Sequence, residues 1–173
     1  MAENRRSFLL AAAGVVSTAA LAVTVAGGSV YRVWWDQPHS RGLRFLSDDE
    51  VEFTDALADA IFPPSPNLPI RGRDAQVGRV LDEVLGGMAS FQQKMLRLSF
   101  HLLDQYPLAT HGRPFRELSA SEGAQVVAGW AGSEIAELRG LVAGTYIFVT
   151  MSYSVHPLVA PTFAAHFRCG YGR

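Results

Sequence analysis

The sequence predicts an all-α fold in which about five helices pack as an irregular bundle, preceded by an N-terminal signal or anchor helix. Three observations support this prediction. Apolar residues recur at helical spacing, capping residues precede these segments, and Pro or Gly follows them. No stretch shows sustained alternation of period two, the pattern of half-buried strands. With 49% apolar residues among 173, the chain can bury one hydrophobic core once its N-terminal segment is set aside.

The first two helices are expected from their start and stop signals. Ser47 stands three residues before Glu50, which makes a capping box, and Pro63 ends the helix that follows. Asp74 is the expected N-cap of the second helix, and Gly86 with Gly87 ends it. The apolar positions of the two helices are Val51, Thr54, Leu57, Ala58 and Ile61, and Val77, Val80, Leu81, Val84 and Leu85.

A third helix is predicted over residues 89–106, before Pro107. A second capping box, formed by Ser119 and Glu122, opens the fourth helix, which Gly132 ends. One face of the third helix is lined by Phe91, Met95, Leu98, Leu102 and Tyr106, and the fourth carries Val126, Val127 and Trp130.

The fifth helix is long and apolar. Ser133 is its expected N-cap, residues 134–154 form it, and Pro157 ends it. Residues 158–167 add a last short turn. Because residues 147–151 are rich in β-formers, a strand is the alternative there. The inner face is expected to consist of Leu138, Leu141, Val142, Tyr146, Val149 and Tyr153.

The N-terminus has the pattern of an export signal. Arg5 and Arg6 precede an uncharged apolar run over residues 9–26. With Phe8 and Leu9 following the arginine pair, the segment resembles a twin-arginine (Tat) signal, which directs folded proteins across the membrane through the Tat translocase. The alternative is a general secretion signal with a chance arginine pair.

Cleavage of this segment stays open. Small residues offer cleavage sites, whereas residues 8–31 have about the length of a bilayer core and would anchor the domain outside. In the anchored form, Trp34 and Trp35 would lie at the outer membrane interface. The organisation is therefore a signal or anchor over residues 1–30, a linker over 31–45 and a helical domain over 46–173.

The sequence contains no recognised catalytic or cofactor motif. It has no HExxH metal helix, P-loop, dinucleotide fingerprint, G-x-S-x-G elbow or haem-attachment motif. The net charge of −1, without a basic block, argues against nucleic-acid binding. His101 with Asp104 and His166 with Cys169 are the residual candidates for chemistry. The charged residues 48–50 are explained by their place at a helix N-terminus.

Four aromatic residues are candidates for contact with a partner. Trp34, Trp35 and Trp130 are compatible with core, membrane interface or partner contact. Tyr153 is a further candidate for partner contact. Cys169, the single cysteine, cannot form an internal disulfide, so it is either a free thiol or half of an intermolecular bond.

Three stretches resemble a known family. Residues 46–64 (LSDDEVEFTDALADAIFPP), 112–119 (GRPFRELS) and 152–157 (SYSVHP) are similar to the opening helix, a helix start and the last helix end of the gluconate 2-dehydrogenase subunit 3 family. The Tat-type signal also fits this family. The tail over residues 167–173 departs from the I-G-Y segment with which many members end.

The resemblance implies a non-catalytic small subunit of a periplasmic dehydrogenase complex. The large subunit would be of the glucose–methanol–choline type, carry FAD and oxidise sugars or other alcohols, and a cytochrome c subunit often completes such a complex. This chain would carry no cofactor, supply the Tat signal and stay bound, with Cys169 available for a disulfide to the large subunit. The alternative function is an independent, membrane-anchored structural or metal-binding protein of the cell envelope.

Overall fold

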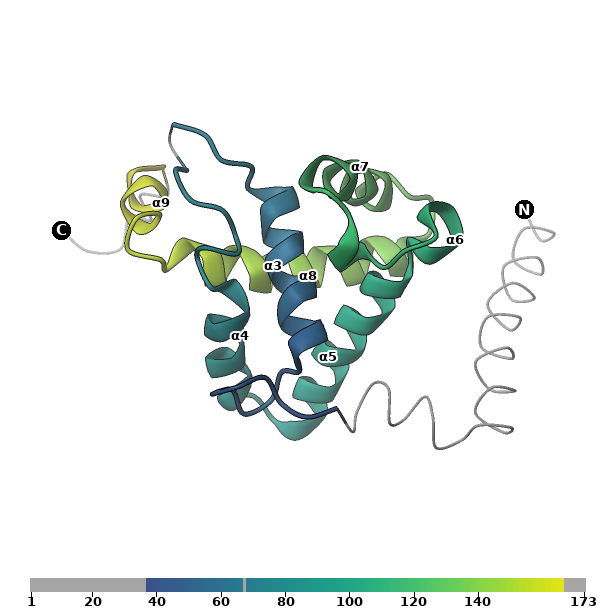
Figure 1. Ribbon diagram of the computed structural model, residues 1–173, viewed down its shortest axis with the longest axis horizontal. Coiled ribbons are helices and arrows are strands. Elements are labelled where there is room, and N and C mark those ends of the chain that lie inside the picture. The colour runs from purple at the N-terminus through teal and green to yellow at the C-terminus, as the bar shows by residue number, and fades with distance from the viewer. Residues whose placement is uncertain (1–36, 67, 167–173) are drawn as a thin grey trace. The chain divides into compact units, whose positions relative to one another are not determined.

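The computed structural model describes residues 37–66 and 68–166, and within these ranges the chain consists of helices and loops without a β-strand (Figure 1). The predicted all-α fold is confirmed. The elements are α3 (Asp48–Ile61), α4 (Val77–Gly86), α5 (Ser90–Gln105), α6 (Leu108–His111), the 3₁₀ helix η1 (Phe115–Glu117), α7 (Ala120–Ala131), α8 (Ala136–Ser154) and α9 (Ala160–His166). Residues 147–151 lie inside α8, so the alternative of a strand there is wrong.

Helix α3 is the central element of the fold. It crosses in front of α8 in Figure 1 and contacts α4, α5, α7, α8 and η1. Phe53 projects from α3 into the core, where its ring centroid lies 5.8 Å from that of Phe100 and 5.6 Å from that of Phe115. The side chain of Phe53 is 1% exposed. One aromatic residue thus joins α3, α5 and η1.

The two predicted capping boxes are confirmed. The amide of Ser47 donates to Glu50 Oε2 over 2.8 Å, and the amide of Glu50 donates to Ser47 Oγ over 3.4 Å. Ser119 and Glu122 exchange the equivalent pair of hydrogen bonds at the start of α7. Each box satisfies two backbone donors that the first turn of a helix leaves free.

The predicted N-cap Asp74 is wrong. The N-cap of α4 is Gln76, which has a left-handed conformation (φ 52°) and no side-chain capping bond. The amide of Gly78, in the first turn of α4, donates instead to Asp55 Oδ1 on α3 over 3.1 Å. A carboxylate from a different helix therefore satisfies the donor that a local cap would have taken.

Ser133 also differs from its predicted role. Helix α8 begins after Ile135, and the amide of Ile135 donates to Ser133 Oγ over 3.2 Å. Ser133 therefore stabilises the turn that leads into α8, and it is not the N-cap of the helix.

Trp130 and Tyr153 both belong to the core. Trp130 is 2% exposed and packs between Phe115 and Tyr106, with centroid distances of 5.2 and 5.9 Å. Tyr153 is fully buried and stacks on Phe62 at 4.5 Å. Of the alternatives considered for Trp130, the structure supports the core. Tyr153 lies on the predicted inner face of its helix and offers no exposed area to a partner.

Two contacts hold irregular segments against the helices. The hydroxyl of Tyr153 donates to the carbonyl of Ile70 over 2.8 Å, which ties the loop after α3 to α8. Asp82 of α4 accepts the backbone amides of residues 44–46 at 2.8–3.0 Å. Residues 44 and 45, at the end of the predicted linker, are therefore hydrogen-bonded to α4.

Candidate functional site

The apolar stripe of α5 lies at the surface. Phe91 is 71% exposed, Met95 46%, Leu102 44% and Tyr106 48%. A helix of a bundle usually turns its apolar face to the core, so this exposure is unusual. The helix buries a different face, which contains Leu96, Phe100, His101, Leu103 and Asp104.

A buried charged cluster lies on the inner side of α5. Glu50 Oε1 lies 2.8 Å from Arg97 Nε and 3.0 Å from His101 Nε2. Glu50 is 1% exposed and His101 6%. Burial raises the pKa of Glu50, but hydrogen bonds from His101 and Arg97 outweigh it and hold the pKa below its ordinary value. Arg97 and His101 therefore reach Glu50 from the inner side of α5, beside the buried Phe100, and the apolar stripe that begins at Phe91 lies on the outer side.

A second charged cluster joins α5 to η1. Asp104 accepts a hydrogen bond from the backbone amide of Arg116 over 3.0 Å and forms an ion pair with one terminal nitrogen of its guanidinium. The other terminal nitrogen of Arg116 lies 3.3 Å from Asp49 Oδ2. Burial raises the pKa of Asp104, even though Arg116 opposes the shift. His101 with Asp104 was a candidate pair, and the structure pairs His101 with Glu50 and Asp104 with Arg116.

These clusters join helices to one another, a structural role that was not predicted from the sequence. Glu50 and Asp49 were expected to be explained by the helix N-terminus alone. Glu50 also joins α3 to α5, and Asp49 also joins α3 to η1. Because the Glu50–His101 pair is buried, it offers no open surface for a substrate, and we assign it no catalytic role.

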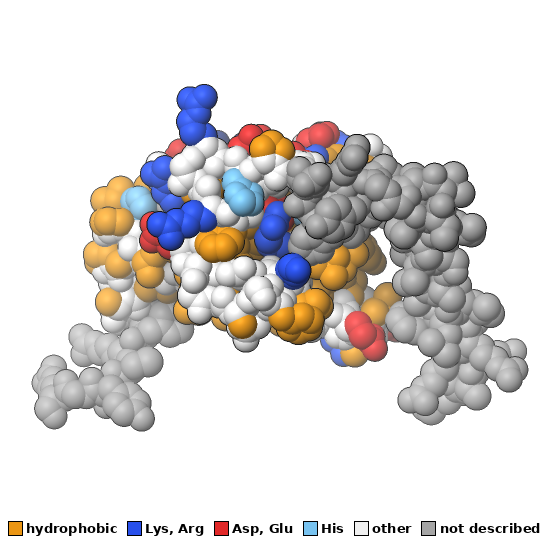
Figure 2. Space-filling view, turned by 90° about the horizontal axis from the view of Figure 1, so that it is seen from below, with side chains coloured by type: hydrophobic (Ala, Val, Ile, Leu, Met, Phe, Trp, Pro, Cys, Tyr) orange, Lys and Arg blue, Asp and Glu red, His pale blue; other side chains and the backbone are white. Residues whose placement is uncertain are grey.

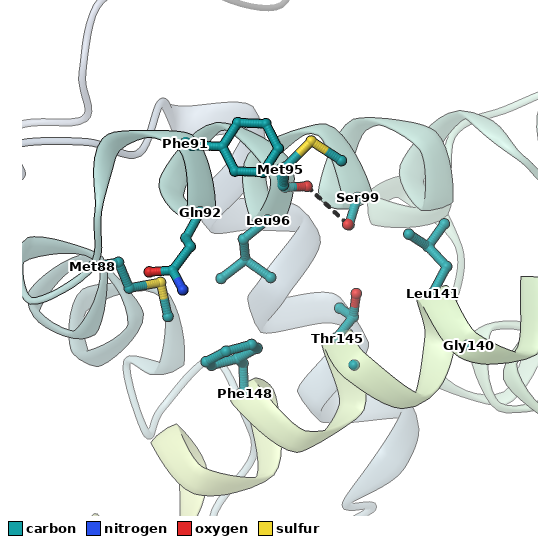
Figure 3. A pocket seen from close by; sticks show the side chains of 11 residues that line it. Met88, Phe91, Gln92, Met95, Leu96, Ser99, Gly140, Leu141, Thr145 and Phe148 are labelled. Atoms are coloured by element: carbon teal, nitrogen blue, oxygen red, sulfur yellow. Dashed lines mark hydrogen bonds between the residues drawn. The ribbon is translucent and has the colours of Figure 1, made fainter. Parts of the chain in front are cut away.

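A groove separates α5 from α8. It has a volume of about 480 Å³, and none of the 11 residues that line it is charged (Figure 3). Met88, Phe91 and Met95 border it on one side, and Leu141 and Phe148 on the other. Large apolar side chains and the absence of charge are typical of a surface that binds an apolar partner.

Helix α8 adds a second exposed apolar surface beside the groove. Ile147 and Met151 are each 56% exposed, and Val155 at the helix end is 59% exposed. Figure 2 shows that hydrophobic side chains reach the surface on the side of the molecule seen from below. The exposed apolar residues of α5 and α8 are therefore grouped around the groove, whereas isolated apolar residues are common on any protein surface.

The groove has three features that point to close packing against another chain. Gly140 and Gly144 line it, and a Cβ added to either glycine would meet no atom within 4 Å. Thr145 also lines it and is 2% exposed. Thr145 Oγ1 has no hydrogen-bond partner among the described residues, and Figure 3 shows the hydroxyl directed toward the space between the helices. The sequence pattern predicted the α5 stripe but none of these features of the groove. The four-residue spacing of Gly140 and Gly144 was the signal available for them.

Several candidate residues cannot be placed. The export-signal residues Arg5, Arg6, Phe8 and Leu9, the aromatic residues Trp34 and Trp35, and Cys169 all lie outside the described residues. His166 is the last residue of α9. Within residues 37–66 and 68–166, no three His, Cys, Asp or Glu residues come together as a metal site. In the same ranges, no helix has both the length and the apolar character needed to cross a membrane.

The comparisons with known proteins give one match. No curated protein and no solved structure matches the chain. The model of the family described as gluconate 2-dehydrogenase subunit 3 matches residues 48–153, which include every helix from α3 to α7 and nearly all of α8. The family name denotes a subunit of a dehydrogenase complex. Since the match covers more than half of the sequence, the chain belongs to the gluconate 2-dehydrogenase subunit 3 family.

Proposed function

We propose that this chain is the non-catalytic small subunit of a FAD-dependent dehydrogenase complex that oxidises alcohols or sugars. The observation that carries the proposal is the exposed apolar surface of α5 and α8 in a chain that belongs to a family of dehydrogenase subunits. Such a surface is costly for a free protein and favourable for a subunit that stays bound.

The chemistry of the complex is assigned to the partner. Glu50 and Asp104, two carboxylates with shifted pKa values, are held in ion pairs between the elements, and Asp55 accepts the amide of Gly78. The large subunit would carry FAD, and a cytochrome c subunit would complete the complex. In this division of roles, the small subunit contributes binding surface and stability, and the large subunit contributes catalysis.

Export is the second part of the proposed function. Arg5 and Arg6, followed by Phe8 and Leu9, would direct the chain to the Tat translocase. Because this route accepts folded proteins, a flavoprotein bound to the small subunit would cross with it and needs no signal of its own. The complex would then reside in the periplasm, either released or held at the membrane through the N-terminal segment.

Purification of the tagged chain from its native host tests this proposal. We expect a yellow preparation with flavin absorbance and a second, larger band on a denaturing gel. A colourless preparation with a single band would contradict the proposal. Metal analysis of that same preparation would then test the alternative of an independent metal-binding envelope protein.

A further inference from the structure

We propose that the groove between α5 and α8 receives one helix of the large subunit, which packs against Gly140 and Gly144 through an uncharged, apolar face. This inference rests on the proposed function and specifies the surface through which it is carried out. Four features of this region support the assignment: the length of the apolar surface, the two glycines, the absence of charge and one buried hydroxyl.

The length of the apolar stripe fits a helix better than a small molecule. The stripe on α5 continues from Phe91 past the groove to Tyr106. At the rise of an α-helix, the 15 steps from residue 91 to residue 106 span roughly 22 Å, which exceeds the length of a drug-sized ligand. An antiparallel or parallel helix of about four turns would cover the stripe.

The two glycines set how closely that helix can approach. Gly140 and Gly144 are one turn apart on α8, and open space lies where each Cβ would be. Missing side chains at this spacing let the backbone of a neighbouring helix come close, so that large side chains of the partner can fill the groove. Phe148 of α8 and Leu96 of α5 also line the groove, and they would supply apolar contacts for such side chains.

Thr145 supplies the feature that points to an occupant. Its Oγ1 is buried and has no partner among the described residues, although buried hydroxyl groups are usually hydrogen-bonded. The hydroxyl is directed toward the space between the helices in Figure 3. A polar uncharged group of the incoming helix, such as a Ser, Thr or Asn side chain, would satisfy it. A charged group would be unfavourable there, because no residue lining the groove could pair with it.

The test replaces Gly140 and Gly144 by Leu in the full-length tagged chain and measures the flavin that co-purifies from the native host. Leu has a higher helix propensity than Gly, and open space surrounds both positions, so the variant should fold at least as well as the native chain. The probe is the flavoprotein that co-purifies with the native chain. We expect Gly140→Leu with Gly144→Leu to lower the flavin retained per chain by at least about tenfold.

The matched control is Gly129→Leu. Gly129 lies on the exposed side of α7, where an added Cβ also meets no atom within 4 Å. The control should retain the native flavin content. A second variant, Thr145→Val, removes only the hydroxyl, and we expect it to weaken the complex about tenfold without lowering the thermal stability of the chain alone.

Each outcome has a distinct meaning. Native flavin content in both groove variants would overturn the inference and leave the proposed function intact. Absence of flavoprotein from the native chain itself would overturn the proposed function, and the inference with it. If the purified chain forms a dimer that Gly144→Leu disrupts while flavoprotein binding is unaffected, the occupant is a second copy and the inference is wrong. Should a groove variant melt below the native chain, Phe91→Ser, at a site 71% exposed, repeats the test with little effect on the core.

Discussion

Glu50 on α3 and His101 on α5 meet in the interior of the domain, with Oε1 and Nε2 3.0 Å apart. Arg97 joins the same carboxylate, and Phe100 is buried on the same side of α5. The apolar stripe of α5 lies on the outside of the molecule. A buried electrostatic contact and an exposed apolar surface therefore lie on two sides of the same helix.

Replacement of Glu50 tests the importance of this contact. Glu50→Gln leaves Arg97 without its buried carboxylate, and we expect the free energy of unfolding to fall by about 3 kcal/mol. Since the pKa of Glu50 lies below its ordinary 4.5, the stabilisation is complete above that value and is lost as the pH falls through the folded-state pKa. Denaturant unfolding at neutral and acidic pH should therefore show a difference that shrinks in acid. Glu52→Gln, at an exposed position of the same helix, is the control, and an equal effect of both changes would contradict this account.

Asp55 should have the opposite dependence on pH. Burial raises its pKa to about 6, although the amide of Gly78 and the charge of Arg73 oppose the shift. The ionised form is therefore disfavoured in the folded chain, and stability falls as the pH rises from the unfolded-state pKa toward 6. Asp55→Asn keeps an acceptor for Gly78 and should stabilise the chain by about 1–2 kcal/mol at pH 7.5, after allowance for partial exposure. Thermal melting at pH 4 should show little of this gain, and a gain of the same size at both pH values would refute the assignment.

Gly72 marks a close approach between the turn before α4 and the helix α3. A Cβ at this position would lie 2.8 Å from the carbonyl carbon of Ala58 and would also strike the Ala58 side chain. Because backbone atoms of α3 cannot move aside easily, we expect Gly72→Ala to destabilise the chain by about 1–3 kcal/mol. Gly129→Ala, at an exposed helical position, should stabilise it slightly. Equal melting temperatures for the two variants would show that the turn is not packed in this way.

Cys169 provides a test of a covalent link. If it forms a disulfide with the large subunit, a non-reducing gel of the purified complex will show a heavier band that disappears on reduction. Cys169→Ser should abolish that band and leave the non-covalent complex to be detected by flavin absorbance. Identical mobility with and without reductant would exclude the disulfide.

The sequence predicted the helix starts well where a capping box marks them. The capping boxes at Ser47 and Ser119 depend on residues three positions apart, and both are present in the structure. The predicted cap at Asp74 failed because the first turn of α4 is satisfied by Asp55, which lies 23 residues before its partner Gly78. No local pattern contains that information.

The candidate site could be predicted only in part for the same reason. The stripe from Phe91 to Tyr106 is visible in the sequence, but the orientation of α5 depends on contacts with distant residues, such as that of Arg97 with Glu50, 47 residues earlier. The positions of Arg97, His101 and Asp104, at helical spacing on another face of α5, were the available indication that this face also had partners. The groove itself required the relative placement of α5 and α8, which only the tertiary structure provides.

The most direct test of the central claim is a change of the arginine pair in the native host. The large subunit should depend on this chain for export, so Arg5→Lys with Arg6→Lys should leave both subunits in the cytoplasm. Cell fractions assayed for flavin-dependent dehydrogenase activity and immunoblotted for both subunits provide the measurement. The account predicts loss of periplasmic activity and a cytoplasmic complex of both subunits. Normal export of the flavoprotein in the Arg5→Lys, Arg6→Lys variant would contradict the account.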